Sequence, residues 1–149
     1  MKHPQTLAKE LNKMFPNKDM KVIGDNACCA FVLMWCLGIE PDDIEAIKTI
    51  QRMRDNGALR QDCVVFWFKA VPYLSGRELE NVEFKKINSL LGIKERTPVL
   101  MAKPGNKEGV GHWVGVENGK IEFNPLEYSE NVANGRPVEM RALKISGRK

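Results

Sequence analysis

Long hydrophobic runs are scarce in this chain of 149 residues. The longest stretch without a charged residue runs from Asn26 to Ile39, which is shorter than the roughly 20 apolar residues that a membrane-spanning helix needs. The first residues, Met1 to Gln5, lead into an amphipathic pattern and not into the apolar core of a signal peptide. We therefore expect a cytoplasmic protein with no membrane span.

Cysteine and histidine are also few, with four and two residues respectively. The cysteines stand at positions 28, 29, 36 and 63, which is a poor disulfide framework, so we expect reduced thiols. The chain has neither a Cys-x-x-Cys motif nor a spaced histidine pair, which disfavours zinc and leaves only a cysteine–histidine metal site open. We predict no cofactor, and no role for the terminal His3.

Neither sign of charge dominates the chain. The net charge of +4 comes from mixed signs, and the dense basic cluster from Arg136 to Lys149 has no interleaved aromatic residues. This pattern disfavours nucleic acid as a partner. The length and the apolar content of 43% are sufficient for one compact domain, which we predict to span residues 1–149. Nothing in the sequence indicates an oligomeric state.

The first part of the chain has helical patterns. Apolar residues at helical spacing predict an amphipathic helix from Pro4 to Phe15, and a polar approach, Lys18 to Ile23, follows it. Asp25 or Asn26 is a good N-cap for the next element. That element is apolar on every side up to Gly38, which predicts a buried central helix.

Two more elements complete this half. Proline followed by acidic residues predicts a helix from Pro41 to Asn56 that covers the central helix. Asp62 is a candidate cap for a segment from Cys63 to Val71, which Pro72 and Gly76 end. We predict a helix for this segment, with a strand as the alternative, because its apolar run has no clear period.

After Gly76 the chain changes to shorter pieces rich in β-branched residues. We predict a helical turn over Asn88–Ile93 and strands over Val82–Ile87, Pro98–Ala102, Val110–Glu117, Lys120–Asn124 and Pro137–Ile145. Helices first and strands second indicate an α+β domain. A mainly helical half, residues 1–76, is expected to pack its buried helix on an antiparallel sheet from residues 77–149, with a cleft where the halves meet.

Two adjacent thiols, Cys28 and Cys29, stand at the predicted start of the buried helix. The free N–H groups and the dipole of a first helical turn favour thiolate, which is the nucleophilic form of cysteine. Adjacent side chains cannot both point into a core, so at least one thiol is expected to face a cleft or the surface. We expect Cys36 and Cys63 to be buried apolar side chains.

A hairpin in the second half carries the other candidate groups. Asn118-Gly119 between two apolar runs predicts the turn, and the length of its loop decides which residues face each other. A two-residue turn sets His112 opposite Pro125 and leaves Asn124 on the other face. A three-residue loop with Gly119 in the bulge position sets His112 directly opposite Asn124. Only this second register is expected to form a histidine–asparagine pair, in which asparagine orients a general base.

A cysteine at the head of a buried helix, the strand Gly-His-Trp-Val, and then a polar residue with proline resemble the papain-like cysteine peptidase superfamily. The spacing is similar to C39-type and NlpC/P60-type domains and to small papain-like proteins of phages and plasmids. The resemblance covers about Gly24 to Pro125. It implies a papain-like fold, a thiolate nucleophile, His112 as general base and acid, and Asn124 as orienting residue. C39-like relatives usually have aspartate at the third position, so Asn124 follows the papain pattern.

The resemblance leaves two cysteines as candidate nucleophiles. The papain and NlpC/P60 pattern selects Cys28, whereas the pattern of the phage and plasmid proteins, which matches further along the helix, favours Cys29. Papain-like enzymes complete the oxyanion hole with an upstream glutamine. We identify none here, and Asn26 is the nearby amide that can donate. Trp113 is expected to line the substrate cleft.

Two functions remain open at this point. The first is a cysteine hydrolase that cleaves an amide bond of a peptide or protein substrate through an acyl-enzyme. The second is a binding module that keeps the papain-like scaffold with little or no catalysis, for example a phage-derived protein that acts on a host partner. The missing glutamine favours the second function, and the joint presence of cysteine, histidine and asparagine favours the first.

Overall fold

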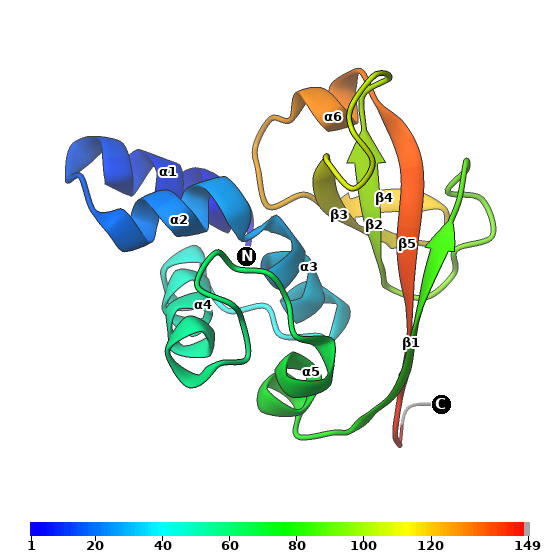
Figure 1. The fold of residues 1–149 in the computed structure, drawn as a ribbon, viewed down its shortest axis with the longest axis horizontal. Coiled ribbons are helices and arrows are strands. Elements are labelled where there is room, and N and C mark those ends of the chain that lie inside the picture. Colours follow the sequence, from blue (N-terminus) through cyan, green and yellow to red (C-terminus); the bar gives the residue numbers. More distant parts are fainter. Residues whose placement is uncertain (148–149) are drawn as a thin grey trace.

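The structure is a computed structural model that describes residues 1–147 (Figure 1). Within these residues the chain forms six helices and one five-stranded sheet. The helices are α1 (Pro4–Met14), α2 (Lys18–Asn26), α3 (Cys28–Cys36), α4 (Asp43–Asn56), α5 (Trp67–Ser75) and α6 (Glu130–Ala133). The strands are β1 (Leu79–Lys86), β2 (Thr97–Ala102), β3 (His112–Glu117), β4 (Lys120–Phe123) and β5 (Arg136–Ile145).

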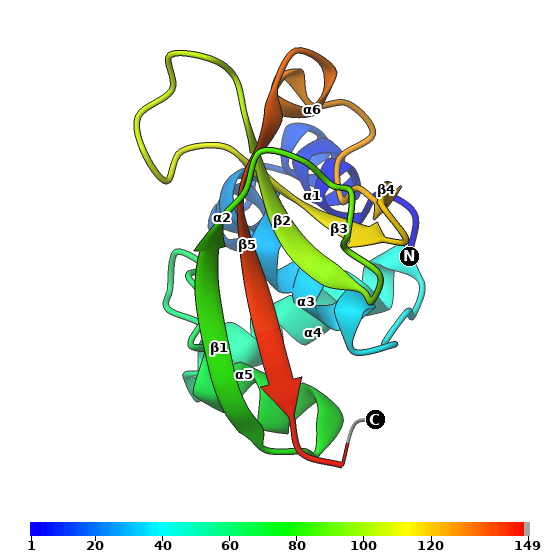
Figure 2. The ribbon, with the colours of Figure 1, turned by 90° about the vertical axis from the view of Figure 1, so that its right-hand side faces the viewer.

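The strands form one antiparallel sheet in the order β1-β5-β2-β3-β4. Figure 2 shows this sheet in front of the helices, with α3, α4 and α5 behind it. Helices α1 to α5 all precede the first strand, so the predicted α+β class, with a helical half before a β half, is confirmed. In the described part of the chain, no helix is long and apolar enough to cross a membrane.

Helix α3 is the buried centre of the molecule, as its sequence predicts. Its residues from Ala30 to Cys36 are all buried, and the helix packs on β3. The ring of Trp35 stacks on Phe123 of β4, with ring centroids 6.0 Å apart. Gly115 of β3 permits this close approach, because a Cβ atom there would lie 2.4 Å from the Trp35 ring. The strand backbone thus forms one wall of the core around α3.

The segment before α3 differs from the prediction. Residues Lys18 to Ile23 are not an irregular approach but the first part of α2, whose free N–H groups are capped by the side chain of Asn17. Asp25 and Asn26 are therefore the last residues of α2 and do not cap α3. Ala27 alone separates the two helices, which leaves α3 without a side-chain cap.

The predicted fourth helix begins later and ends later than expected. Residues 63–66 are not helical, and α5 continues through Pro72 to Gly76, which ends it with a φ of +70°. Asp62 caps no helix, because its carboxylate pairs with the side chain of Arg60 at 2.6 Å. The apolar run of this segment is therefore divided between an irregular part and a helix.

The predicted strands are all present, with ends that differ by a few residues. The helical turn predicted over Asn88–Ile93 is wrong, since these residues form bends and a turn. Their apolar side chains, with Ile87, pack on Val114 and Val116, on the face of the sheet opposite α3. The short helix α6, between β4 and β5, was not predicted.

Candidate functional site

The structure brings together the histidine and the asparagine of the predicted site. His112 is the first residue of β3, is only 4% exposed, and has its Nε2 atom 2.7 Å from Oδ1 of Asn124. Asn124 directly follows β4. The pair therefore lies at the end of the β3–β4 hairpin that is farther from its turn.

The register that forms this pair is not the one predicted for it. Asn118 and Gly119 make a two-residue turn with φ values of +51° and +75°, so the three-residue loop is wrong. A β-bulge interrupts the β3–β4 ladder one pair further along. It shifts the pairing by one residue, which turns Asn124 to the face that carries His112. The bulge thus brings the two residues to one face, as was expected of the longer loop, but it does not set His112 directly opposite Asn124.

Asn124 determines which nitrogen of His112 carries the proton. Its Oδ1 atom also accepts the backbone N–H of Leu126 at 3.0 Å, so this atom is the amide oxygen and Nε2 of His112 donates to it. In the neutral ring Nδ1 then carries the lone pair, and it has no hydrogen-bond partner within residues 1–147. This is the tautomer that a base acting through Nδ1 requires.

The environment also keeps the His112 ring neutral at pH 7. Burial lowers its pKa from the ordinary value of 6.5, the hydrogen bond with Asn124 raises it, and the charge of Lys9 lowers it. Burial is the largest of these effects, and the pKa is lowered overall. A neutral imidazole is the form that can accept a proton from a thiol.

The N-terminal segment holds this pair against α2, which sequence reasoning missed. Nδ1 of His3 lies 3.0 Å from the carbonyl oxygen of Asn124, so the expectation that His3 has no role is wrong. Gln5, which is 2% exposed, donates its backbone N–H to Pro125 at 3.0 Å and its side-chain amide to the carbonyl of Gly24 at 2.9 Å. An upstream glutamine is therefore present, and its amide links α1 to α2. The one sequence signal for Gln5 is its position at the start of the amphipathic helix α1.

Cys28 is the thiol that meets the start of β3. Backbone N–H groups of Trp113, Cys29 and Cys28 itself act on its sulfur and lower its pKa, while burial raises the pKa by more. Trp113 is the residue after His112. The thiol is therefore protonated at pH 7 in this structure, but three N–H groups are in place to stabilise a thiolate.

The other three thiols have different surroundings. Burial raises the pKa of Cys29 well above its ordinary value, Cys28 and Cys36 raise it further, and the charge of Arg141 lowers it. Cys36 and Cys63 are buried, as predicted, and burial raises the pKa of Cys63 to about 11. In the part of the chain that the structure describes, no two cysteines form a disulfide.

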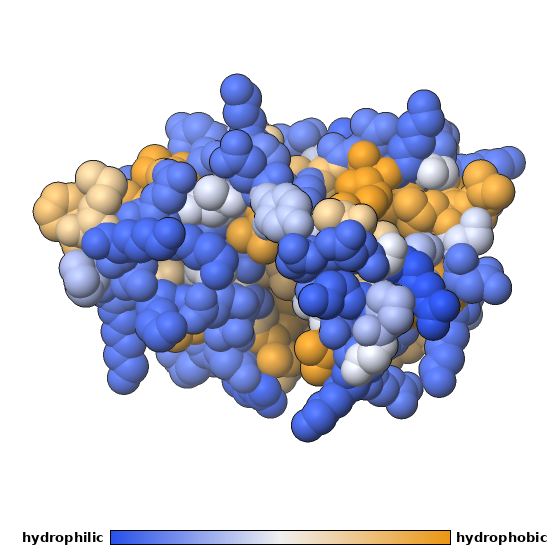
Figure 3. Space-filling view, turned by 90° about the horizontal axis from the view of Figure 1, so that it is seen from above, coloured by the Kyte–Doolittle hydropathy of each residue, from blue (hydrophilic) through white to orange (hydrophobic). Residues whose placement is uncertain are grey.

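A pocket of about 520 Å³ opens beside the thiols, where the helical half meets the sheet. Both Cys28 and Cys29 line it. Asn26 and Trp113, the residues that the sequence assigned to the oxyanion hole and the substrate cleft, line it too, and so does Arg141. Figure 3 shows a hollow between the two halves of the molecule on the face seen from above, with apolar side chains at its base.

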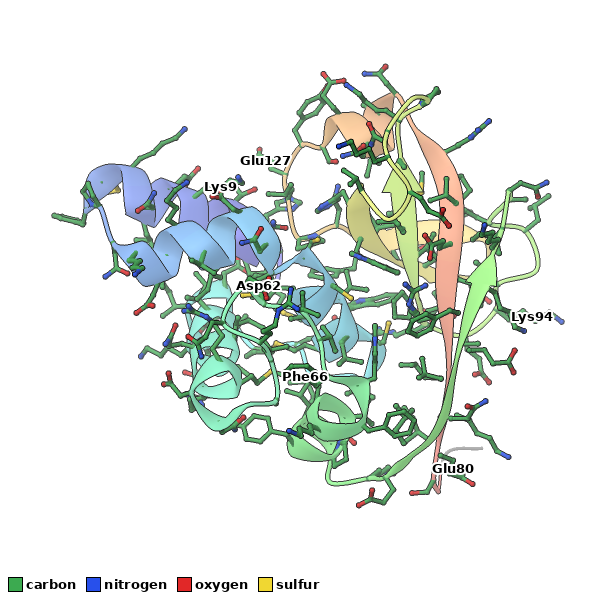
Figure 4. The ribbon with its side chains drawn as sticks, viewed as in Figure 1. Lys9, Asp62, Phe66, Glu80, Lys94 and Glu127 are labelled. Carbon is green, nitrogen blue, oxygen red and sulfur yellow. The ribbon has the colours of Figure 1, made fainter. Side chains whose placement is uncertain are left out.

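On the side of the helical half, part of the pocket wall is the irregular segment between α4 and α5. Asp62 and Phe66, both in this segment, are labelled in Figure 4. Cys63 in this segment has a φ of +69°, a left-handed conformation that is strained for a residue with a side chain. The side chains of Val64, which lines the pocket, and of Phe66 in the same segment are exposed. The pocket therefore combines apolar walls with three cysteines, Cys28, Cys29 and Cys63, and a guanidinium group.

The thiols and the imidazole are neighbours along β3 but are not bonded to each other. Gly111 and Trp113 line the pocket, and His112 between them does not. Successive side chains of a strand point to opposite faces of the sheet, so Trp113 lies on the face that packs on α3 and His112 lies on the other face. Within residues 1–147, neither thiol at the start of α3 is hydrogen-bonded to His112.

No group of three or more His, Cys, Asp or Glu side chains among residues 1–147 is arranged to hold a metal ion. Comparisons of the chain with protein-family models, with curated proteins and with solved structures give no match. The function of the site therefore has to be inferred from its own geometry and from the motifs of the sequence.

Proposed function

We propose that this chain is a cysteine hydrolase with a papain-like fold that cleaves an amide bond of a peptide or protein. Cys28 is the nucleophile, His112 the general base and acid, and Asn124 the residue that orients it. The observation that carries the proposal is the 2.7 Å contact between Nε2 of His112 and Oδ1 of Asn124, because it leaves Nδ1 free to accept a proton. We place the nucleophile at Cys28 and not at Cys29, which the sequence pattern favoured, because backbone N–H groups lower the pKa of Cys28 whereas the neighbouring thiols raise that of Cys29.

The proposed reaction has two steps. Nδ1 of His112 takes the proton of the Cys28 thiol, and the sulfur attacks the carbonyl carbon of the substrate. The oxyanion accepts hydrogen bonds from the backbone N–H of Cys28 and from the side chain of Asn26. His112 then gives the proton to the amine as the carbon–nitrogen bond breaks, which leaves a thioester. Water, deprotonated by His112, attacks the thioester, releases the acid and restores the thiol.

The side chain of Asn26 suits this role because it is exposed at the pocket and makes no hydrogen bond within residues 1–147. One movement is required for the first step. The ring of His112 has to approach the sulfur to about 3–3.5 Å, past the start of β3. Catalytic hydrogen bonds are often long in unliganded enzymes and tighten when substrate binds.

A binding module on the same scaffold is the second candidate. It is favoured by the raised pKa of both pocket thiols and by the absence of His112 from the pocket lining. A site that keeps its thiol protonated and its imidazole out of contact holds a partner without cleaving it. A phage-derived protein that blocks a host partner fits this description.

Acylation by p-nitrophenyl acetate at pH 7 distinguishes the two functions. The hydrolase forms an acetyl thioester on Cys28, which peptide mapping locates, and hydrolyses it, so that p-nitrophenol release continues beyond one equivalent. We expect His112→Ala to slow the acylation of Cys28 about a hundredfold, since general base catalysis contributes about 10²–10⁴. Cys36→Ala, which changes a buried thiol of the same helix, is the matched control and keeps the wild-type rate.

Acetylation that is spread over lysines and thiols and is unchanged in His112→Ala contradicts the hydrolase. The binding module is then the remaining proposal.

A further inference from the structure

Arg141 of β5 is held at the pocket by two aromatic rings and by the hydrogen bonds of one nitrogen of its guanidinium group. The group lies 3.8 Å from the ring centroid of Phe84 and 4.8 Å from that of Trp113. Its Nη1 atom donates to Oε1 of Glu139 at 3.1 Å and to the carbonyl of Met140 at 3.3 Å. The side chain is 12% exposed. These contacts fix both the plane and the rotation of the guanidinium group.

The other edge of the same group has no partner. Nε is buried without a hydrogen bond, and Nη2 has none within residues 1–147. Nε–H and Nη2–H of arginine point in parallel, and this edge binds a carboxylate through two hydrogen bonds. A buried donor without an acceptor is unfavourable. The edge of Arg141 is therefore suited to an acceptor that the described chain does not supply.

The arginine that carries this edge lies at the pocket that holds the thiols. Arg141 lines that pocket together with Cys28 and Cys29, and its charge acts on the Cys29 thiol. The two acidic residues of the lining, Asp25 and Asp62, already pair with lysine and arginine side chains outside it. An anion that enters the pocket therefore meets an arginine with an unpaired guanidinium edge, in the same pocket as the candidate nucleophile Cys28 and within electrostatic reach of Cys29.

We propose that Arg141 binds a carboxylate of the substrate and directs the enzyme to an amide bond that lies next to one. The carboxylate is either the free end of a peptide main chain or an acidic side chain. The inference rests on the proposed function, because it identifies the substrate of that same site. The rings of Phe84 and Trp113 lie against the guanidinium group and leave it only 12% exposed, and lower exposure to water strengthens a hydrogen-bonded ion pair.

Arg96 provides a matched control on the opposite end of α3. Its guanidinium group also stacks on a tryptophan, Trp35, at 4.3 Å. Nη1 of Arg96 donates to the carbonyl of Trp35 at 2.8 Å and pairs with Glu40 at 3.1 Å, and Nε lies 3.6 Å from Glu117. Both edges of this arginine are occupied. The same substitution at the two arginines therefore separates the loss of a stacked charge from the loss of an open edge.

Alkylation by iodoacetate and by iodoacetamide tests the proposal. Each reagent forms a sulfur–carbon bond with a thiolate as its carbon–iodine bond breaks and iodide leaves, but only iodoacetate carries a carboxylate. We expect the ratio of the iodoacetate to the iodoacetamide rate constant at the pocket thiols to fall about tenfold in Arg141→Gln, since the lost hydrogen bonds are charge-assisted. Arg96→Gln keeps the wild-type ratio. Peptide mapping assigns each rate to Cys28 or Cys29.

Two further measurements keep the test decisive. The wild-type ratio must exceed the ratio for glutathione, a comparison that needs no variant, and thermal unfolding shows that each variant is folded. Arg141→Lys retains the charge without the parallel edge, and its ratio is expected between those of wild type and Arg141→Gln. Equal ratios in wild type, Arg141→Gln and glutathione overturn the proposal. The iodoacetamide rate alone reports on the thiol, so a failure of the proposed function is seen separately from a failure of the carboxylate site.

Competition identifies the source of the carboxylate. N-acetylglycine presents a main-chain carboxylate, the α-amide of N-acetylglutamate presents a side-chain carboxylate, and N-acetylglycine amide is the neutral control. We compare how much each compound slows the alkylation of the wild type by iodoacetamide. The carboxylate that the site takes is the one whose compound slows it more than the neutral amide does and loses this effect in Arg141→Gln.

Discussion

The two ends of α3 contain similar parts that differ in how completely they are paired. Each end meets β3, has an arginine stacked on a tryptophan, and borders a cavity of more than 500 Å³. At the end near Trp35 the arginine is paired on both edges, and the tryptophan ring is stacked on Phe123. At the end near Cys28 one arginine edge is open, and the base nitrogen of His112 has no partner among the described residues.

This difference shows that cavity size does not identify the functional end. The cavity near Trp35, at about 550 Å³, is as large as the one beside the thiols, at about 520 Å³. What separates the ends is the presence of polar atoms that the fold has positioned without giving them a partner. Such atoms are rare in stable interiors and indicate binding or catalysis. We therefore place the candidate site at the end near Cys28.

The largest difference between the ends is expected in thiol reactivity. Cys28→Ser removes the proposed nucleophile, whose pKa is lowered by backbone N–H groups against the larger effect of burial, and should lower the fastest rate of alkylation by iodoacetamide at pH 7 about a hundredfold. Cys36→Ser changes the buried thiol at the opposite end and should leave this rate unchanged. If the fast reaction survives in Cys28→Ser and is lost in Cys29→Ser, the nucleophile is Cys29.

A second difference is expected in stability. Gly115→Ala places a Cβ atom 2.4 Å from the Trp35 ring, so the strand or the ring must move. Overpacking of this kind typically costs about 1–3 kcal/mol of unfolding free energy, which urea unfolding measures. Asn26→Ala, at the open end, should change it by less than about 0.5 kcal/mol. Trp35→Leu should relieve part of the Gly115→Ala effect, and strict additivity of the two substitutions would contradict the close contact.

The pair at the open end makes a third prediction. Asn124→Ala leaves both Nε2–H of His112 and the N–H of Leu126 without an acceptor, and should destabilise the protein by about 1–3 kcal/mol. Asn124→Asp keeps an oxygen for both donors and should lose much less. Nitrogen NMR of the His112 ring should show Nε2–H as the neutral tautomer in the wild type and a mixture of tautomers in Asn124→Ala.

The smallest expected effect is on the pH dependence of stability. The pKa of His112 is lowered in the folded state, so the unfolded chain binds a proton at higher pH than the folded chain does. The stability that this provides is fully present above the ordinary pKa of 6.5 and is lost as the pH falls through the lower, folded value. His112→Gln should therefore flatten the fall in unfolding free energy just below pH 6.5. An unchanged slope would show that the ring is not buried as described.

Much of the fold follows from local pattern. The absence of charge from Ala27 to Ile39 identifies α3 as buried, and the Asn118-Gly119 dipeptide identifies the hairpin. The sequence does not reveal α2 as a separate helix. Asn17 caps its start, but the polar residues at its end, Asp25 and Asn26, have the pattern of an N-cap for α3. Neighbouring short helices compete for the same capping signals, and the sequence alone does not decide between them.

The candidate site was predicted in part. The hairpin register depended on a bulge that arises from packing, since Ile121 belongs to the apolar cluster on one face of the sheet and Phe123 stacks on α3 at the other. Residues two apart share a face in a regular strand, so an extra residue is needed between these two contacts. Arg141 and Gln5 carry no motif. Their contacts depend on long-range packing, which brings β5 to the pocket of the thiols and α1 to Gly24 and Pro125.

The pH dependence of Cys28 alkylation by iodoacetamide, measured from pH 5 to 9 in wild type and His112→Ala, tests most directly whether the open end is a catalytic pair. A base at His112 predicts that wild-type Cys28 reacts faster than glutathione below pH 7 and that this advantage disappears in His112→Ala. A rate that rises steadily to pH 9 and is the same in both proteins is the behaviour of a thiol with a raised pKa and no base. That result would contradict the assignment of Cys28 and His112 as nucleophile and base.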